Sequence, residues 1–479
     1  MKQDANTLQK KSSGIALLPF LVFIVIYLGA GLYEQSKGTA MAFYQFPSVT
    51  AIFIATILAF FIGKGSINEK FSTFARGAGN ENILIMLIIY LLAGAFSSVS
   101  KSMGGVDATV NMGVSVIPVQ FLAAGVFVIS AFLGIATGTS MGTIGAIVPI
   151  ALGIANKAGL NTTLLMAACV GGAMFGDNLS MISDTTIAAT RTQGCELRDK
   201  FKLNGLIALP AAVLTIVLLL IFGRPDTIVN MGSTSFSFIK VIPYLFVLIF
   251  ALAGWNVFLV LTIGIFASGI IGMTSGDLTL MTFAQKVWSG FTDMGEVFCL
   301  SLFCGGLAEL TTHNGGINWL ISKISKMIRG QRSAQFGIAA LVSLADIATA
   351  NNTVAIIISG SISKDMSRQY KVDPRRSASL LDIFACIFQG FIPYGAQLLL
   401  VGSLSKGVVN PVQMIPLLWY QQLLLVFAVV SVFIPFADGV CRKNPWNWEY
   451  DVAESGVEEK KAILAKNKEA ESAAATTAV

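Results

Sequence analysis

The sequence predicts an all-α polytopic membrane protein, built from two inverted structural repeats with broken or re-entrant helices at the membrane midplane. Three observations lead to this prediction. Hydrophobic residues make up 54% of the 479 residues and charged residues only 12%, about half of the roughly 25% that soluble domains carry. About fourteen apolar segments follow one another along the chain. Short motifs of the first half recur in the second half at a nearly constant offset.

The composition excludes several classes of protein. A soluble protein could not cover so much apolar surface with so few charges, which excludes a cytosolic enzyme and a disordered chain. A transmembrane β-barrel would alternate apolar and polar residues and would lack long apolar runs. The net charge of +6 does not indicate a nucleic-acid partner, because the basic residues lie in short loops between apolar runs. Six cysteines without a Cys-x-x-Cys pair are predicted to be small core residues.

The apolar segments divide the chain into predicted regions. They cover 14–33, 47–63, 82–98, 117–135, 137–155, 162–190, 203–222, 240–254, 256–273, 293–311, 334–350, 352–363, 377–403 and 412–436. Some are too short to cross a bilayer fully. The regions are a cytoplasmic N-terminus (1–13), a first membrane repeat (14–222), an external linker (223–239), a second membrane repeat (240–436) and a cytoplasmic tail (437–479). We expect the tail to be partly disordered, with a short surface helix around 456–472.

The distribution of basic residues orients this arrangement. With the N-terminus inside and every segment crossing, most of the 32 Lys and Arg fall on the cytoplasmic side, as the positive-inside rule requires. The seven that fall outside are Lys37, Lys101, Lys157, Arg224, Lys240, Lys286 and Lys406. The sequence therefore predicts a multi-pass protein of the cytoplasmic (inner) membrane with both termini in the cytoplasm.

The two halves of the chain resemble each other. Gly104-Gly105-Val106 matches Gly315-Gly316-Ile317, and 315 − 104 = 211; Ile135-Ala136-Thr137 matches Ile347-Ala348-Thr349, and 347 − 135 = 212. Segment 82–98 pairs with segment 293–311, and the odd number of crossings between them would insert the halves upside down. Inverted repeats are typical of secondary transporters, in which two similar halves exchange conformations. Chance similarity between Gly- and Ala-rich helices is the alternative. No Walker A pattern is present, which argues against ATP-driven pumping.

Acidic residues lie within the apolar segments, which contain no Lys or Arg by this division of the chain. They are Asp177, Asp184, Glu296, Glu309, Asp346 and Asp382. An unpaired charge in hydrocarbon costs at least about 2.5–3.5 kcal/mol, so these acids need protons, water or a bound cation. Carboxylate oxygens suit hard cations, and the pattern predicts a site for Na⁺ or H⁺. Glu296 and Asp382 lie close to segment ends, where a simple interfacial position is the alternative.

The densest polar cluster is residues 176–186, of which eight are Gly or polar. Asp, Asn, Ser and Thr favour helix breaks and caps, and a broken helix would offer carbonyl and side-chain oxygens to a cation. A polar face lining a water-filled cavity is the alternative. The candidate ligands in this cluster are Asp177, Asn178, Ser180, Ser183, Asp184 and Thr185.

Two further clusters are predicted to be unwound tips that meet near the midplane. The first spans 137–143 and supplies Thr139. The second, its repeat mate, supplies Asn351 and Asn352 and is preceded by Asp346. Close packing of small residues is the alternative for both.

Residues 389–397 form the second-half counterpart of the 176–186 cluster. The Gly-Pro-Gly pattern within this apolar segment predicts another kink. Gln389, Tyr394 and Gln397 are neutral, so one half would supply carboxylates and the other amides and a phenol. Tyr394 could equally be a packed aromatic residue. The single histidine, His313, could sense pH, or it could be structural or solvated.

The run Gly176-Asp177-Asn178-Leu179-Ser180-Met181-Ile182-Ser183-Asp184-Thr185-Thr186 resembles the signature of the NhaC-type Na⁺/H⁺ antiporters, within the ion-transporter superfamily. The turn at Gly194-Cys195-Glu196-Leu197 also fits, and the resemblance covers roughly 14–436. Met181 stands where the family pattern leads us to expect proline, which could soften the helix break. The resemblance implies sodium-coupled exchange with Asp177 and Asp184 as ligands of the transported Na⁺. It leaves the cargo open, because relatives resemble sodium–proton antiporters, malate–lactate exchangers and amino-acid transporters.

The leading hypothesis is therefore a Na⁺/H⁺ antiporter that works by alternating access and is not an enzyme. Coupled transport of an amino acid or organic acid is the alternative, weakened by the lack of an intramembrane Arg to hold a carboxylate. A channel or a scaffold is a third class, against which the repeat and the broken segments argue. The expected partners are the lipid bilayer and a small cation, with a small organic solute and a homodimer left open. No nucleic acid and no cofactor is expected.

Overall fold

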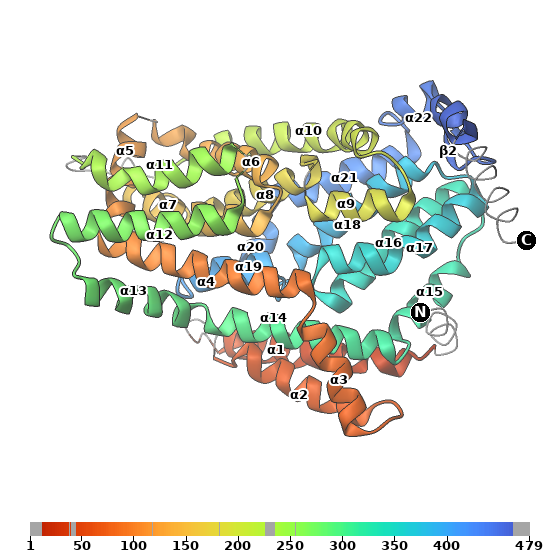
Figure 1. The fold of residues 1–479 in the computed structure, drawn as a ribbon, viewed down its shortest axis with the longest axis horizontal. Coiled ribbons are helices and arrows are strands. Elements are labelled where there is room, and N and C mark those ends of the chain that lie inside the picture. The colour runs from red at the N-terminus through yellow and green to blue at the C-terminus, as the bar shows by residue number, and fades with distance from the viewer. Residues whose placement is uncertain are drawn as a thin grey trace, which may run out of the picture.

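The computed structural model describes residues 12–37, 39, 45–116, 118–181, 183–225, 235–253 and 255–462. It is almost entirely helical, and many of its helices run along one long axis (Figure 1). In these residues, seven helices are long and apolar enough to cross a membrane, or up to nine if each bent pair is one span. The predicted all-α polytopic fold is confirmed. Several of the predicted apolar segments, however, form helices too short to cross a membrane.

Among the described residues, the first half begins with a short 3-10 helix and contains ten α-helices. They are η2 (Gly14–Leu17), α1 (Leu18–Ser36), α2 (Ser48–Phe61), α3 (Ile67–Ala78), α4 (Glu81–Ser102), α5 (Gly105–Val116), η4 (Val119–Phe121), α6 (Leu122–Thr137), α7 (Ser140–Ala158), α8 (Thr162–Leu179), α9 (Asp184–Gln193) and α10 (Leu197–Phe222).

The second half repeats this order and ends in a small hairpin. Its elements are α11 (Phe238–Leu252), α12 (Val257–Thr274), α13 (Leu280–Asp293), α14 (Gly295–His313), α15 (Gly316–Ser325), α16 (Gln331–Thr349), α17 (Asn352–Tyr370), α18 (Pro374–Phe391), α19 (Ala396–Leu404), α20 (Pro411–Met414), η5 (Ile415–Leu417), α21 (Trp419–Phe433), α22 (Gly439–Lys443), β1 (Trp446–Asn447), β2 (Val452–Ala453) and η6 (Glu454–Gly456).

Helix breaks occur at corresponding places in the two halves. Between α6 and α7, Gly138 is left-handed and Thr139 is extended; between α16 and α17, Ala350 and Asn351 adopt the same two conformations. The α8–α9 break recurs between α18 and α19, since α9 starts at residue 184 and α19 at residue 396, and 396 − 184 = 212. The α8–α9 break forms although Met181 replaces the expected proline, because Ser180 and Ser183 are both extended.

Glycines allow helices of the two halves to pack backbone to backbone. A Cβ on Gly94 of α4 would meet the Gly290 carbonyl oxygen of α13 at 2.3 Å, and a Cβ on Gly77 of α3 would meet the Gly305 carbonyl oxygen of α14 at 2.3 Å. Gly305 lies 211 residues after Gly94, and Gly290 lies 213 residues after Gly77, so each pair lies within one residue of the 212 offset. The two contacts are therefore equivalent under exchange of the halves to within one residue of register.

Several helices were not predicted, because they lie between the apolar segments. The regions that form α3, α5, α13 and α15 were assigned to loops between spans, because they are short or carry charges. α3 and α13 occupy corresponding positions in the two halves, as do α5 and α15. The prediction for the cysteines also needs correction: Cys169, Cys304 and Cys386 are buried, Cys195 and Cys441 are half-buried, and Cys299 is exposed. All six are free thiols.

The residues after α21 lie at one end of the helix bundle, beside the C-terminal end of α17 (Figure 1). β1 pairs antiparallel with β2, and Asp451 forms ion pairs with Arg368 (2.7 Å) and Lys364 (3.3 Å). Burial raises the pKa of Asp451, but hydrogen bonds from these two cations outweigh burial and hold its pKa below the usual value. The predicted tail helix begins at Val457, and its continuation beyond residue 462 lies outside the described residues.

Candidate functional site

A small cavity of about 60 Å³ lies where the helix breaks of the two halves meet. Ends of α7, α8, α9, α17 and α19 form it, together with the residues directly before α7 and α17 and the first turns of α4. The residues that line it are Ile85, Ile89, Thr139, Ser140, Met141, Asp177, Asp184, Asn351, Asn352, Thr353 and Gln397. Five of the predicted site residues therefore share one cavity: Thr139, Asp177, Asp184, Asn351 and Asn352.

Asp177 contributes a buried carboxylate from the last turn of α8. Its exposed fraction is 3%, and its Oδ1 accepts a hydrogen bond of 3.0 Å from the backbone N–H of Ser140. Ser140 is the first residue of α7, where unsatisfied N–H groups and the helix dipole favour an anion. The α6–α7 break thus directs a helix N-terminus at Asp177.

Asp184 contributes a second carboxylate from the first residue of α9. Its side chain is exposed, and it reaches the cavity between α9 and α17. Oδ1 accepts a hydrogen bond of 3.1 Å from the Thr185 backbone N–H, and Oδ2 accepts one of 2.9 Å from the Thr353 hydroxyl. Each carboxylate therefore meets the start of a half-helix, α7 for Asp177 and α17 for Asp184.

Neither carboxylate has a basic partner in the part of the chain that the structure describes: none of its ion pairs involves Asp177 or Asp184. Helix N-termini and hydroxyl donors compensate only part of a negative charge. A proton or a small cation would complete the compensation. The oxygens of the carboxylates, amides and hydroxyls in this cavity are suitable ligands for a hard cation.

Amide side chains of the second half connect the breaks to each other. The Gln389 amide donates to Ala350 O (3.3 Å) and to Gln397 Oε1 (2.8 Å), and the Gln397 amide donates to Ser140 Oγ (3.1 Å). With the bond from Ser140 to Asp177, a hydrogen-bonded path runs from the α16–α17 break to the buried carboxylate. Gln389 therefore supports the cavity without lining it.

Tyr394 also supports the breaks without lining the cavity. Its hydroxyl donates to the Ile347 carbonyl oxygen at 2.8 Å, near the end of α16, and its ring packs edge-on against Phe23 at 5.0 Å. Tyr394 is therefore a packed aromatic residue, as the alternative prediction stated. Its hydroxyl also satisfies a backbone carbonyl near the α16–α17 break.

The remaining predicted residues of the 176–186 cluster lie away from the cavity. The Asn178 amide donates to the Tyr420 hydroxyl (3.0 Å) and to Met174 O (3.2 Å). The hydroxyls of Ser183 and Thr185 share a hydrogen bond of 3.0 Å, and Ser180 is buried. These residues shape the break rather than the surface of the cavity.

Asp346 is a fully buried carboxylate of α16. It does not line the small cavity, and within the described residues neither of its oxygens has a hydrogen-bond partner. Asp346 is therefore present at the α16–α17 break, as predicted, but it does not share the surface of Asp177 and Asp184.

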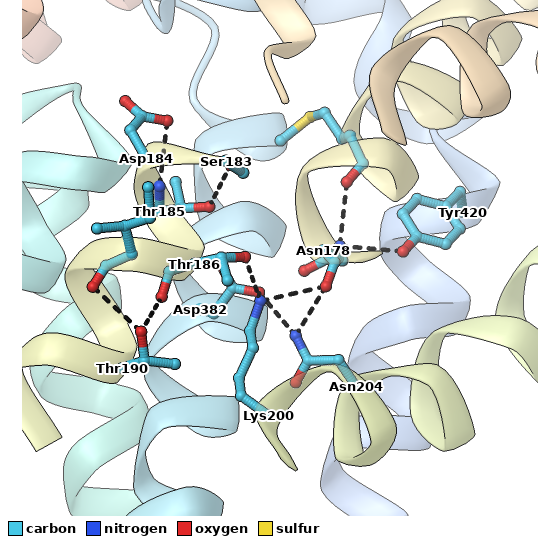
Figure 2. Close-up of polar contacts among 12 residues, drawn as sticks. Asn178, Ser183, Asp184, Thr185, Thr186, Thr190, Lys200, Asn204, Asp382 and Tyr420 are labelled. Carbon is cyan, nitrogen blue, oxygen red and sulfur yellow. Dashed lines mark hydrogen bonds and ion pairs between the residues drawn. The ribbon is translucent and has the colours of Figure 1, made fainter. Parts of the chain in front are cut away.

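The expectation that Asp382 is an interfacial acid without a basic partner is wrong. Asp382 is fully buried and forms an ion pair of 2.7 Å with Lys200, whose side chain is 1% exposed (Figure 2). The predicted apolar segment began only at residue 203 and so left Lys200 in a loop, whereas α10 begins at Leu197. A basic residue within one turn of an apolar segment was the signal for this pair.

Other polar residues singled out in the sequence lie at the periphery. Glu296 is exposed and accepts a hydrogen bond of 2.7 Å from the Ser48 hydroxyl, and Glu309 is half-buried. His313 is exposed at the end of α14. Two hydroxyl residues of the cavity, Ser140 and Thr353, were not among the predicted ligands, although both lie in the polar clusters at 137–143 and 349–353.

A larger vestibule of about 620 Å³ lies further along α4, α7 and α19. From the residue positions on these helices, it begins about 10 Å from the small cavity. Lys101, Lys286 and Lys406 line it together with Asp107 and Asp293, and Lys406 pairs with Asp293 at 3.1 Å. The lining of the vestibule thus carries more lysines than aspartates.

Comparison with known proteins gives sequence relatives that are transporters. Residues 3–224 match the sequence profile of the Na⁺/H⁺ antiporter family. The chain is 21% identical over 452 residues to the malate-2H⁺/Na⁺-lactate antiporter of Bacillus subtilis, covering 86% of this chain and 94% of that protein. It is 29% identical over 180 residues to the Na⁺/H⁺ antiporter NhaC of Alkalihalophilus pseudofirmus, covering 37% and 38%.

Among solved structures, the Alcanivorax borkumensis YdaH transporter matches with a TM-score of 0.43 and 13% identity, covering 88% of this chain and 98% of that one.

Proposed function

We propose that this membrane protein exchanges Na⁺ for H⁺ across the cytoplasmic membrane by alternating access, because residues 3–224 match the sequence profile of the Na⁺/H⁺ antiporter family. The observation that carries the proposal is the pair Asp177 and Asp184, which line one cavity with no ion-paired base in the described chain. Na⁺ and H⁺ would then compete for the same carboxylates. Exchange is obligatory if the transporter changes conformation only when these charges are neutralised.

The size of the cavity favours a cation as cargo. A volume of about 60 Å³ corresponds to about two water molecules, at roughly 30 Å³ each in the liquid. Pockets for organic ligands measure about 300–1,000 Å³. A Na⁺ ion with one retained water would occupy about this volume, whereas a dicarboxylate would require the breaks to separate.

The repeated breaks supply a route to alternating access. α9 packs against α17 of the other half, and α19 packs in the equivalent way against α7. Because each half-helix contacts the opposite repeat, a change in one break would be transmitted to the other. We propose that the halves are inverted and exchange their conformations during transport.

The test is cation-induced proton movement in proteoliposomes that contain a pH-sensitive dye. Addition of Na⁺ or Li⁺ to wild type should release protons from the lumen at neutral to alkaline pH. Asp177→Asn and Asp184→Asn should each slow this release by more than about tenfold, since a hydrogen bond or ion contact to a charged group is worth about 1.5–3 kcal/mol. Glu296→Gln is the matched control, because its carboxylate lies outside the cavity. Correctly inserted aspartate variants that match this control would refute the proposal.

Coupled transport of an organic acid is the second candidate. The relative from Bacillus subtilis is named for malate and lactate, and the lysine-lined vestibule would attract anions. Counterflow of labelled malate, lactate or amino acids distinguishes the two functions, because a cation-only site cannot support counterflow of an organic solute. Lys101→Gln and Lys286→Gln should reduce that counterflow if the second candidate is correct, and should leave Na⁺/H⁺ exchange near the wild-type rate if it is not.

A further inference from the structure

The Lys200 ammonium occupies a closed group of oxygen atoms behind the α8–α9 break. Nζ lies 2.7 Å from Asp382 Oδ2, 2.6 Å from Thr186 Oγ1 and 3.2 Å from the Asn178 carbonyl oxygen (Figure 2). These oxygens come from α18, α9 and α8, so three separate helices converge on one positive charge. The side chains of Lys200 and Asp382 are 1% and 0% exposed.

A second donor completes the group. The Asn204 amide donates to Asp382 Oδ2 at 2.7 Å and to the Asn178 carbonyl oxygen at 3.1 Å. Two of the three oxygens around Nζ are therefore held in place by Asn204 from the next turn of α10. An ammonium group has three N–H donors, and the three oxygens can satisfy all of them.

The oxygens around Nζ have the chemistry of a ligand set for a hard monovalent cation. They comprise one carboxylate, one hydroxyl and one carbonyl at the C-terminal end of a helix, where the helix dipole favours positive charge. No other Lys or Arg in the described chain has an ion pair with Asp382. The group therefore resembles a cation site whose cation is covalently attached to the protein.

The same helix break serves the transport cavity from its other side. Asp177 directly precedes Asn178, and Asp184 lies two residues before Thr186. Figure 2 shows Asp184 pointing away from Lys200. One break thus presents two cation positions, of which one is open and lined by two unpaired carboxylates, and the other is filled by Lys200.

The filled position has no counterpart in the second half. At the offset of 212, Lys200 corresponds to Val412, and Asp382 corresponds to Val170. The repeat therefore does not explain the pair, which makes the two halves electrostatically unequal.

We propose that Lys200 is a tethered cation, which fills a second monovalent-cation site formed by Asp382, Thr186 and the Asn178 carbonyl and so limits transported Na⁺ to the Asp177–Asp184 cavity. This inference rests on the proposed function for its meaning in transport, but the site itself can be tested separately. Removal of the ammonium with Asp382 retained should leave a buried carboxylate that recruits a free Na⁺ ion.

The test measures ²²Na⁺ binding to purified protein in detergent, in a background with Asp177→Asn and Asp184→Asn that removes the carboxylates of the transport cavity. Lys200→Met in this background should create Na⁺ binding, because methionine keeps the chain length without the charge. Lys200→Met combined with Asp382→Asn is the matched control and should bind Na⁺ at least roughly tenfold more weakly. Choline replaces Na⁺ as the inert salt.

The outcomes separate this inference from the proposed function. Na⁺ binding by Lys200→Met but not by its Asp382→Asn control supports the tethered cation, whether or not wild type exchanges Na⁺. A folded Lys200→Met variant that binds no more Na⁺ than its control overturns it. Failure of Lys200→Met to fold in Na⁺ as well as in choline also overturns it, because the site would then not accept a free cation. Loss of exchange in the Asp177→Asn and Asp184→Asn variants concerns only the proposed function.

Discussion

Substitution of Gly176 by alanine tests whether close packing of α6 and α8 positions the buried carboxylate. Gly176 directly precedes Asp177, and its Cα faces the backbone of Gly134 in the last turn of α6. A Cβ at Gly176 would lie 2.4 Å from Gly134 C and from Gly134 Cα, and 2.7 Å from Ile135 N. All three atoms belong to the backbone, so no side-chain rotation can relieve the overlap.

The size of the displacement follows from these distances. Ordinary van der Waals contact of a Cβ begins at 3.4 Å, and the closest contacts here would be 2.4 Å. The helix α8 therefore has to move away from α6 by about 1 Å. Such overpacking costs about 1–3 kcal/mol. The same movement would lengthen the 3.0 Å hydrogen bond from Ser140 to Asp177 beyond the normal range. A misplacement of this size can slow an oriented reaction by up to about a hundredfold.

Two measurements check this prediction. Na⁺-dependent proton movement in proteoliposomes should fall at least about tenfold in Gly176→Ala, and its thermal unfolding temperature should decrease. Gly125→Ala is the matched control, because Gly125 lies in α6, the helix against which Gly176 packs, and a Cβ added there would have nothing within 4 Å. Equal transport and equal stability in the two variants would refute the packing argument for Asp177.

Three further predictions follow from individual contacts. Ala350→Gly should raise stability by up to about 1 kcal/mol in thermal unfolding, because Ala350 has a left-handed φ of 50° that alanine adopts at a cost; a lower unfolding temperature would contradict this. Thr353→Val should raise the Na⁺ concentration for half-maximal exchange roughly tenfold, since it removes the hydroxyl that orients Asp184; an unchanged value would contradict it. Asp451→Asn should increase hydrogen exchange of the β1–β2 hairpin at neutral pH. In wild type, the lowered pKa of Asp451 means that this protection is complete above about pH 4 and disappears only as the pH falls through the folded-state value.

The sequence predicted the helix breaks because their causes are local. Gly138 can adopt a left-handed conformation, Thr139 and Asn351 can cap the helices that follow them, and runs of Ser, Thr and Asp compete with helical hydrogen bonds. The repeat offset then related the breaks of one half to those of the other. These signals need no knowledge of tertiary packing.

The direction of individual side chains could not be predicted in the same way. Asp177 and Asn178 are adjacent, yet Asp177 lines the cavity and Asn178 contacts Tyr420 on another helix. Side chains one residue apart on a helix differ by about 100° in direction, and only the packed neighbours decide which of them faces a cavity. Lys200 was missed for a different reason, since hydropathy places a lysine outside a span even when a buried carboxylate compensates its charge.

The most direct test of the central claim is the proton release that accompanies Na⁺ binding, measured with purified protein in weakly buffered detergent solution. If Na⁺ and H⁺ share the carboxylates of one cavity, Na⁺ should displace protons from wild type, and the double variant Asp177→Asn/Asp184→Asn should neither bind Na⁺ nor release protons. Undiminished Na⁺ binding and proton release in that folded double variant would show that the exchange site lies elsewhere.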